Sequence, residues 1–333
     1  MKITVRKIAE LAGVSPASVS RYMTNTENVS AEIAGKIEST LVALDQEPAV
    51  RRPKKKLILI LLTHLRFDFY SRTLAELLER EEDGEYSFML LRYNPYTPET
   101  VRTFVNRMHP AGVVYFEEEI DSEILHYLQG CGLRTVMCGG VALDHQSDRI
   151  HVNDIAAAYE GTRYLLGLGH RQILFLSDDE RKIGAGFQRI TGSRKAMEEQ
   201  GLSLSEEQII RGGVTYEAGY TAMETALAEN RRFTAVFAFS DELAVGAMAA
   251  LYDAGLRVPE DVSVLGYDDL TIATRVRPAL TTVHQPIGAF VEKTLELFSQ
   301  PPQALHAEIL LPHSIVERQS CRRLQGCGEE KQR

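Results

Sequence analysis

The residues of this sequence with the most distinctive chemistry are an arginine and two aspartates, each of which follows an apolar stretch typical of a buried strand. These residues are Arg189, Asp241 and Asp268. Ligands of open parallel sheets bind beyond the carboxyl ends of the strands, so all three residues are candidates for ligand contact. One guanidinium and two carboxylates on separate loops can form hydrogen bonds to the hydroxyl groups of a sugar.

A helix cap is the alternative role for the aspartates, because a short carboxylate at a helix start accepts hydrogen bonds from free backbone N–H groups. Asp241 opens the stretch Asp241–Ala254, which predicts a helix, so capping is favoured over ligand contact for this residue. Asp269 can cap the next helix in the same way.

The motifs of common enzymes and metal sites are missing from the sequence. Gly184-Ala185-Gly186 lacks the third glycine of a dinucleotide-binding loop, and neither a Gly-Lys-Ser/Thr phosphate loop nor His-Glu-x-x-His occurs. The nine histidines are scattered, and the four cysteines lack metal-ligand spacing, which favours reduced cytosolic thiols. We therefore expect no enzyme activity, no cofactor and no metal ion.

The elements that must position the three residues begin at Leu57, where strands and helices start to alternate. This alternation predicts two successive βαβ sets with parallel sheets. Strands are predicted at Leu57–Leu62, Tyr86–Tyr93, Gly112–Phe116, Arg134–Cys138, Ile150–Val152, Gln172–Leu176, Ala235–Phe239, Val262–Gly266, Thr281–Gln285, Ile309–Leu311 and Ser314–Glu317. Helices are predicted at Tyr70–Glu82, Pro98–Met108, Asp121–Gln129, Asp154–Leu168, Arg189–Glu199, Glu217–Glu229, Asp241–Ala254 and Ile287–Phe298.

The segment before the body, residues 1–46, predicts three short helices. Thr4, Ser15 and Ser30 occupy N-cap positions, and Gly13 provides a tight turn between the first two helices. This arrangement is typical of a DNA-binding helix-turn-helix, although a small helical cap without a DNA role has the same pattern.

The charge distribution favours DNA binding by this segment. Residues 1–56 contain ten Lys/Arg and six Asp/Glu, a net charge of +4, whereas the remaining residues carry a net charge of −13. A basic head on an acidic body binds phosphate at one end only. Residues 47–56 hold two prolines and five arginines or lysines, and they predict an extended linker that meets DNA.

The sequence resembles one family along essentially its whole length. The head contains Ala9-x-x-Ala12-Gly13-Val14-Ser15-x-x-Ser18-Val19-Ser20-Arg21, which resembles the head-piece signature of the lactose-repressor/galactose-repressor family of bacterial transcription regulators. The body matches the same family in Val152-Asn153-Asp154, Leu168-Gly169-His170-Arg171, Ser240-Asp241 and Gly266-Tyr267-Asp268-Asp269.

The resemblance implies an N-terminal all-α helix-turn-helix head and an α/β body of two parallel-sheet lobes that resembles periplasmic sugar-binding proteins. The implied boundaries are 1–46 for the head, 47–56 for a basic hinge, 57–318 for the body and 319–333 for a disordered tail. Lobe one is expected at 57–153 plus 286–318 and lobe two at 154–285, with an effector bound between them.

The resemblance also implies which residues meet DNA, namely Thr4, Ser15, Pro16, Ala17, Ser18, Ser20, Arg21, Arg51, Arg52, Lys54 and Lys55. Pro16 and Ala17 occupy the two positions that set base specificity in the family, yet neither side chain donates a hydrogen bond. Arg21 is therefore expected to make the main polar base contact, to guanine O6 and N7. Lys55 stands where the family inserts a leucine into the minor groove, so we expect phosphate contacts and a less bent operator.

For the effector, the resemblance implies contacts from Phe69, Tyr70, Arg189, Ser240, Asp241, Asp268 and Gln285. Two positions depart from the family pattern. Val214 stands in place of an aromatic residue, for which Tyr216 can substitute, and Gly139 stands in place of an aspartate. Both departures point to a larger or differently oriented ligand.

These observations predict a cytoplasmic, sequence-specific DNA-binding repressor of carbohydrate-utilisation genes, controlled by a sugar or sugar phosphate. One recognition helix reads half a site, so we expect a homodimer on a pseudo-palindromic operator. No apolar run is long enough for a membrane span, and no membrane partner is expected. Two alternatives are open: control by a protein corepressor, and a sugar-binding module of an uptake system, which the missing signal peptide disfavours.

Overall fold

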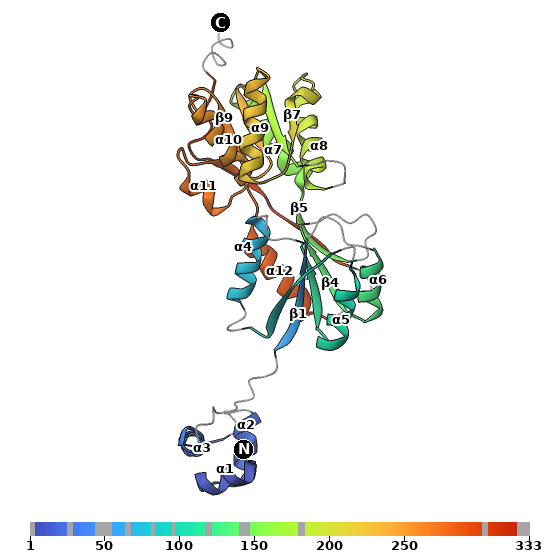
Figure 1. The fold of residues 1–333 in the computed structure, drawn as a ribbon, viewed down its shortest axis with the longest axis vertical. Coiled ribbons are helices and arrows are strands. Elements are labelled where there is room, and N and C mark those ends of the chain that lie inside the picture. The colour runs from blue at the N-terminus through green and yellow to red at the C-terminus, as the bar shows by residue number, and fades with distance from the viewer. Residues whose placement is uncertain are drawn as a thin grey trace. The chain divides into compact units, whose positions relative to one another are not determined.

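The computed structural model describes residues 4–24, 29–43, 55–63, 68–80, 84–94, 97–116, 122–139, 147–178, 184–301 and 306–324 (Figure 1). The chain divides into two units, one of residues 1–56 with 84–87 and one of residues 57–83 with 88–333. Residues 4–43 are called the head below, and residues 57–324 the body. No helix among the described residues is long and apolar enough to cross a membrane.

The head consists of three helices, α1 (Val5–Ala12), α2 (Pro16–Thr24) and α3 (Ala31–Ala43). The Thr4 side chain accepts a hydrogen bond from the backbone of α1, and Gly13 ends this helix with a φ of +64°, a conformation that glycine adopts without strain. The Ser15 hydroxyl accepts from the Ser18 N–H at 3.0 Å and so caps α2.

A small hydrophobic core holds the three helices of the head together. Its buried members are Ile8, Ala9, Ala12, Val19, Tyr22, Ile37 and Leu41. Tyr22 is only 1% exposed, whereas its neighbour Met23 is partly buried. The predicted helix-turn-helix fold of the head is confirmed.

The body contains two six-stranded sheets with the orders β11-β5-β4-β3-β1-β2 and β12-β10-β9-β8-β6-β7. Sheet one, in lobe one, holds β1 (Lys56–Leu62), β2 (Tyr86–Arg92), β3 (Gly112–Tyr115), β4 (Arg134–Cys138), β5 (Asp148–Val152) and β11 (Glu308–Leu311). Sheet two, in lobe two, holds β6 (Ile173–Ser177), β7 (Ile209–Arg211), β8 (Ala235–Ala238), β9 (Ser263–Asp268), β10 (Thr281–His284) and β12 (Ser314–Val316).

Helices lie on both faces of each sheet (Figure 1). Lobe one holds α4 (Asp68–Glu79), α5 (Glu99–Met108), α6 (Ser122–Gly130) and α12 (Ile287–Ser299). Lobe two holds α7 (Asp154–Gly167), α8 (Ala185–Glu198), α9 (Tyr216–Ala228), α10 (Asp241–Asp253) and α11 (Thr271–Arg275). The short elements β7 and α11 were not predicted from the sequence. The predicted helix Arg189–Glu199 starts later than α8, which begins at Ala185.

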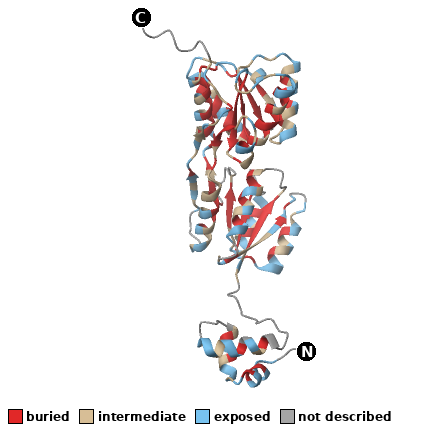
Figure 2. Ribbon diagram, turned by 90° about the vertical axis from the view of Figure 1, so that its left-hand side faces the viewer, coloured by how far each residue is buried: buried red, intermediate tan, exposed pale blue. Residues whose placement is uncertain are grey.

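The inner strands of both sheets are buried on both faces, as their continuous apolar sequences predict (Figure 2). In lobe two, Leu174 and Val236 pack in one core with α9 and α10, whereas Phe237 on the other face lies against Gly161 of α7. In lobe one, Leu59 and Val113 pack with α5 and α6. The predicted class, an α/β body with two sheets, is therefore confirmed.

Three segments connect the lobes, and the third corrects an expected boundary. The chain crosses from β5 into α7, from β10 into α12, and from β11 into β12. β12 pairs antiparallel with β10, with Val316 opposite Thr282. The following residues also stay with lobe two, since the Leu324 N–H donates to the Leu168 carbonyl at 2.9 Å. The expected placement of 314–318 in lobe one and of 319–324 in a disordered tail is therefore wrong; residues 325–333 lie outside the described residues.

Glycines bring two helix pairs of lobe two into backbone contact. A Cβ built on Gly192 of α8 would lie 2.0 Å from the carbonyl oxygen of Ile155 in α7. A Cβ on Gly219 of α9 would lie equally close, 2.0 Å, to the carbonyl oxygen of Leu243 in α10. Because backbone atoms form these contacts, no side-chain rotation can make room for a methyl group.

The Gly192→Ala variant is expected to lose about 1–3 kcal/mol of unfolding free energy, because α7 and α8 must move apart. Gly167→Ala is the matched control, since a Cβ at this position of α7 meets no atom within 4 Å. Alanine is the better helix former, so the control is expected to gain up to about 1 kcal/mol. Urea unfolding followed by circular dichroism measures both variants, and equal stabilities would contradict the close helix contact.

Candidate ligand cleft and DNA-binding helix

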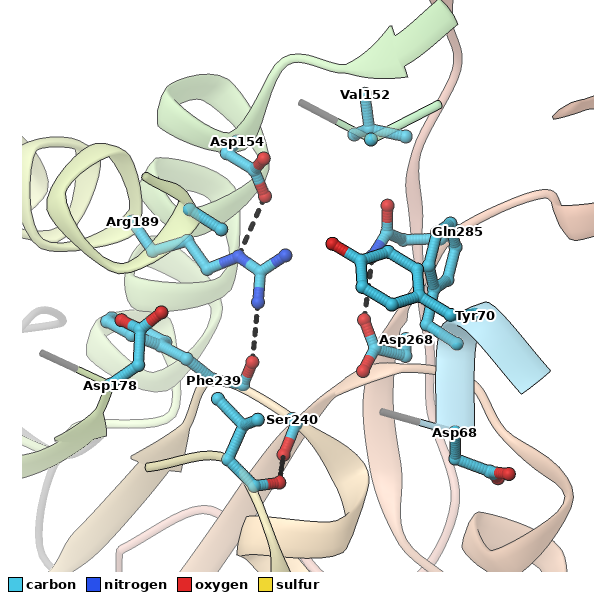
Figure 3. A pocket seen from close by; sticks show the side chains of 14 residues that line it. Asp68, Tyr70, Val152, Asp154, Asp178, Arg189, Phe239, Ser240, Asp268 and Gln285 are labelled. Carbon is cyan, nitrogen blue, oxygen red and sulfur yellow. Dashed lines mark hydrogen bonds and ion pairs between the residues drawn. The ribbon is translucent and has the colours of Figure 1, made fainter. Parts of the chain in front are cut away.

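A cavity of about 710 Å³, including its open mouth, lies at the carboxyl ends of strands from both sheets (Figure 3). It is lined by Asp68, Phe69, Tyr70, Gly139, Val152, Asp154, Asp178, Ala185, Arg189, Val214, Phe239, Ser240, Asp268 and Gln285. Its position is that of small-molecule sites in open parallel sheets. Every residue that was expected to contact an effector lines this cavity, except Asp241.

Arg189 is fixed in the wall of lobe two by several neighbours. Its Nε donates to Asp154 Oδ1 at 2.7 Å, and its Nη1 donates to the Phe239 carbonyl at 2.5 Å. The guanidinium also lies 3.7 Å from the centroid of the Tyr267 ring, whose hydroxyl donates to the same Asp154 oxygen. Burial opposes the charge of Arg189, but the Asp154 carboxylate raises the pKa above its usual value, so the group stays charged.

Asp268 ends β9 and faces the cavity beside Gln285 (Figure 3). Its φ of +110° is strained for a residue with a side chain. The Gln285 amide donates to Asp268 Oδ1 at 2.6 Å and helps to hold this conformation. Burial raises the pKa of Asp268 to about 7, against the opposing effect of Arg189. This carboxyl therefore changes its protonation near neutral pH.

Phe69 and Tyr70 form an aromatic wall on the side of lobe one. They lie on α4 and are 8% and 7% exposed. The Phe69 ring packs against Phe290 at a centroid distance of 5.3 Å, and the Tyr70 ring packs against Phe116 at 5.7 Å. Both rings are thus held rigidly, and they offer an apolar surface to a ring-shaped ligand. The Tyr70 hydroxyl points towards Arg189 across the cavity (Figure 3).

Ser240 lines the cavity, but its hydroxyl is engaged in the fold. Its Oγ accepts from the Leu243 N–H at 3.1 Å and so caps α10. The same hydroxyl donates to the Val214 carbonyl at 2.7 Å. Ser240 therefore forms part of the cavity wall, but its hydroxyl is already engaged in hydrogen bonds within the fold.

Asp241 does not reach the cavity, which corrects its expected role as an effector ligand. The residue is fully buried, its Oδ1 accepts from the Thr282 hydroxyl at 2.5 Å, and its Oδ2 accepts from the Leu270 N–H at 2.6 Å. Both oxygens connect α10 to neighbouring segments of lobe two. Helix capping, the other expectation for Asp241, is also wrong, because Ser240 is the N-cap.

Asp269 does not cap α11, whose N-cap position is occupied by Leu270. One Asp269 oxygen accepts from Arg318 Nη2 at 2.5 Å, and the other lies 2.9 Å from His284 Nδ1. The expected cap is therefore replaced by a contact with His284 of β10 and an ion pair with Arg318 after β12.

Three acidic residues of the cavity are not among those expected to contact an effector. Asp154 belongs to a family motif at a helix start, and its carboxylate holds Arg189. Asp178 directly follows β6, so the rule that selected Asp268 could have found it. Asp68, in the first turn of α4, carried no signal beyond that of an ordinary helix-terminal acid.

The two positions that depart from the family pattern, Val214 and Gly139, both line the cavity. Tyr216, the suggested aromatic substitute, lies outside the lining and is 36% exposed, so that suggestion is wrong. Gly139 has a φ of +83°, and a Cβ there would lie 3.5 Å from the Phe69 ring. A Cβ at this position would therefore make an ordinary van der Waals contact with the aromatic wall, and the positive φ, not a clash, disfavours a side chain there.

The exposed face of α2 carries Pro16, Ala17, Ser20 and Arg21. Residues three or four positions apart lie on the same side of a helix, as do Ala17 with Ser20 and Arg21, and Pro16 with Ser20. Arg21 forms no ion pair with any described residue of the chain, so its guanidinium is available for DNA. This face has the composition and the exposure that a recognition helix needs.

The other expected DNA contacts fall into two groups. Ser18 is partly buried, and its hydroxyl lies 2.8 Å from that of Ser15. Thr4 and Ser15 cap helices, which leaves them exposed at helix starts, where phosphates bind favourably. Lys55 lies just before β1, whereas Arg51, Arg52 and Lys54 lie outside the described residues.

Comparisons with known proteins agree with both parts of the molecule. Residues 4–48 match the model of bacterial regulatory proteins of the lacI family, and residues 162–321 match the periplasmic binding protein-like domain. The chain is 28% identical to catabolite control protein A of Priestia megaterium over 96% of this chain and 99% of that protein. It is 33% identical to the transcriptional repressor PurR of Proteus mirabilis (strain HI4320), over 85% of each chain.

A solved structure shares the fold over nearly the whole length. The transcriptional regulator CelR, in complex with cellobiose, gives a TM-score of 0.72 at 24% identity, covering 96% of this chain and all of that one. A helix-turn-helix head with a body of this topology defines a class of DNA-binding transcription regulators. The chain belongs to the lacI family of bacterial regulatory proteins.

Proposed function

We propose that the chain represses carbohydrate-utilisation genes and that a sugar bound in the cavity controls its affinity for the operator. The observation that carries this proposal is a charged donor, Arg189, and an acceptor, Asp268, in one buried cavity with an aromatic wall. Sugar hydroxyls can both accept from the guanidinium and donate to the carboxylate. The cellobiose complex of the similarly folded CelR supports the same ligand class.

The switch is proposed to act through closure of the two lobes. Residues of both lobes line the cavity, so a ligand that contacts both stabilises the closed arrangement. Arg72 of α4 already donates to the Thr271 hydroxyl of α11 at 2.7 Å and joins the lobes outside the three crossovers. In a homodimer on a pseudo-palindromic operator, closure changes the spacing of the two heads. Coupling of about 1–3 kcal/mol between effector and operator is typical.

A thermal-shift screen with mono- and disaccharides tests the proposal, followed by operator binding with and without each hit. A ligand at a hundred times its Kd is expected to stabilise the protein by about 2.7 kcal/mol. Operator binding that changes only with a protein partner, and with no sugar, would favour the corepressor alternative. Sugar binding without any operator binding would favour a sugar-binding module.

The Arg21→Ala variant is expected to lose about 1–3 kcal/mol of operator affinity and to accept other bases at one position of each half-site. Arg21→Lys is the matched control, because lysine keeps the charge but cannot form the bidentate contact to guanine. Operator titrations across single-base variants and salt concentrations measure both effects. Uniform weakening on every sequence, with a shallower salt dependence, would show that Arg21 contacts phosphate instead.

A further inference from the structure

The turn that follows β9 is unusual, because two successive residues with side chains have a left-handed backbone. Asp268 has a φ of +110° and Asp269 a φ of +59°. Residues other than glycine seldom adopt these conformations, so surrounding contacts must hold the turn in place. One side of the turn is fixed by the sheet, in which Asp268 lies opposite His284 of β10. The contacts on the other side therefore decide where the Asp268 carboxylate points.

Asp241 fixes the other side of the turn. Its Oδ2 accepts from the Leu270 N–H at 2.6 Å, directly after the two residues with positive φ, and Leu270 itself is buried. Its Oδ1 accepts from the Thr282 hydroxyl of β10 at 2.5 Å. This carboxyl group thus connects the start of α10 both to the turn and to the strand beside β9.

The sheet leaves a space for this carboxyl group. Gly266 of β9 lies opposite Thr282 in the register of the two strands. A Cβ built on Gly266 would lie only 2.3 Å from Asp241 Oδ1. A larger residue at this position would therefore force Asp241 away from its two donors. The absence of a side chain at Gly266 allows Asp241 to reach the turn.

Other residues hold the turn from the side of the crossovers. Gln285 donates to Asp268 Oδ1 at 2.6 Å, and Arg318 Nη2 donates to Asp269 Oδ1 at 2.5 Å. Both contacts are to side chains, which move when the backbone that carries them moves. Asp241 instead binds the main chain at the end of the turn, so these contacts do not replace it.

The hydrogen bonds of Asp241 matter more to the turn than its charge. Burial and the nearby Asp268 carboxyl raise the pKa of Asp241 well above its usual value, against the hydrogen bonds from Thr282 and Leu270. The charged form is thus unfavourable at this position. An asparagine has the same shape, and its oxygen can accept from Leu270 while its Nδ2 donates to the Thr282 hydroxyl. Alanine can make neither bond.

We infer that Asp241 is a positioning residue for the effector: by holding the turn after β9, it keeps the Asp268 carboxylate directed into the cavity. This inference rests on the proposed function and gives a role in binding to a side chain outside the cavity lining. Without the hydrogen bond to Leu270, the backbone of Asp268 and Asp269 can return to negative φ values. The Asp268 carboxylate then turns away from the position in which it meets a sugar hydroxyl.

Amide hydrogen exchange of the ligand-free full chain tests the anchor without any sugar. We expect residues 268–272 to exchange at least tenfold faster in Asp241→Ala than in the wild type, because the Leu270 N–H loses its acceptor. Asp241→Asn should rescue the slow exchange. Thr162→Val is the control for an ordinary loss of stability, since it removes a buried hydroxyl that lies 3.0 Å from Ser193 Oγ, between α7 and α8. It should change the exchange of residues 268–272 less than threefold.

A second variant applies if Asp241→Ala does not fold. Thr282→Val removes the donor to Asp241 Oδ1, keeps the shape of the side chain, and makes the same chemical change as the control Thr162→Val. It should also speed the exchange of residues 268–272, and Thr282→Ser, which keeps the hydroxyl, should restore the slow rate. Exchange of residues 268–272 that is no faster in these variants than in Thr162→Val would overturn the inference.

Isothermal titration with glucose, ribose and cellobiose tests whether the anchor acts through Asp268. For a sugar that binds the wild type, we expect Asp241→Ala to bind at least tenfold more weakly and Asp241→Asn to recover most of the affinity. In the Asp268→Asn background, Asp241→Ala should weaken binding less than threefold, because the carboxylate that it positions is already absent. Equal weakening in both backgrounds would overturn the inference. If no sugar binds the wild type and Asp241→Ala still speeds the exchange, the anchor is supported and the proposed function alone fails.

Discussion

Replacement of Arg189 by alanine is expected to lower the free energy of unfolding by about 3–5 kcal/mol. The substitution removes the partner of Asp154, which is 5% exposed, and leaves a buried carboxylate without a compensating charge. It also removes the N–H donor of the Phe239 carbonyl and the cation over the Tyr267 ring. Urea unfolding of the ligand-free chain measures the loss.

A double variant separates the charge effect from the loss of side-chain volume. Arg189→Met with Asp154→Asn removes both charges, keeps much of the apolar volume, and leaves an oxygen for the Tyr267 hydroxyl. It should recover most of the lost stability, because a buried ion pair can often be replaced by neutral groups at little cost. Both proteins should lose the effector response. A loss below about 1 kcal/mol in Arg189→Ala, or no recovery in the double variant, would contradict the structural role of the ion pair.

Asp268→Asn is expected to raise the stability of the ligand-free protein at pH 8 by up to about 4 kcal/mol. Burial raises the pKa of Asp268 from 3.8 to about 7, so the folded protein holds a proton that the unfolded chain releases between these values. The contribution of this group to stability therefore falls as the pH rises from about 4 to about 7, and is constant above. Asparagine avoids this cost, and it tolerates a positive φ better than most residues.

Unfolding curves of wild type and Asp268→Asn from pH 4 to pH 8 test this expectation. The difference between the proteins should be small near pH 4, should grow up to about pH 7, and should then stay level. A variant less stable than the wild type at pH 8 would contradict it. Under the proposed function, the same variant should bind operator normally but respond weakly to effector, because its amide cannot replace the charged acceptor.

The sequence was sufficient to predict most of the fold, because buried parallel strands carry an unusually clear signal. Continuous apolar runs such as Leu57–Leu62 identify strands without any knowledge of their neighbours. The three-residue strand β7 and the short helix α11 are too brief for any periodicity. The return of β12 to sheet two could not be predicted, since pairing with β10 depends on contacts distant in sequence.

Two kinds of signal predicted residues of the cavity. The residue type and its place after an apolar strand selected Arg189 and Asp268, the family resemblance selected Phe69, Tyr70 and Gln285, and all five line the cavity. Asp241 carried both signals, yet its side chain points into lobe two, where Thr282 and Leu270 occupy its oxygens. The direction of a side chain at a strand end depends on packing, and the sequence alone does not contain that information.

The late position of β11 and β12 also affects how the protein emerges from the ribosome. β11 adds to sheet one beside β5, with Ile309 opposite Ile150, and β12 adds to sheet two beside β10. Most of lobe one is synthesised first, but its sheet cannot be completed until β11 has been translated, after all of the helices of lobe two. Until then both sheets expose an unpaired edge, the kind of surface on which nascent chains aggregate. A message truncated before the codon for Glu308 would thus leave neither lobe complete.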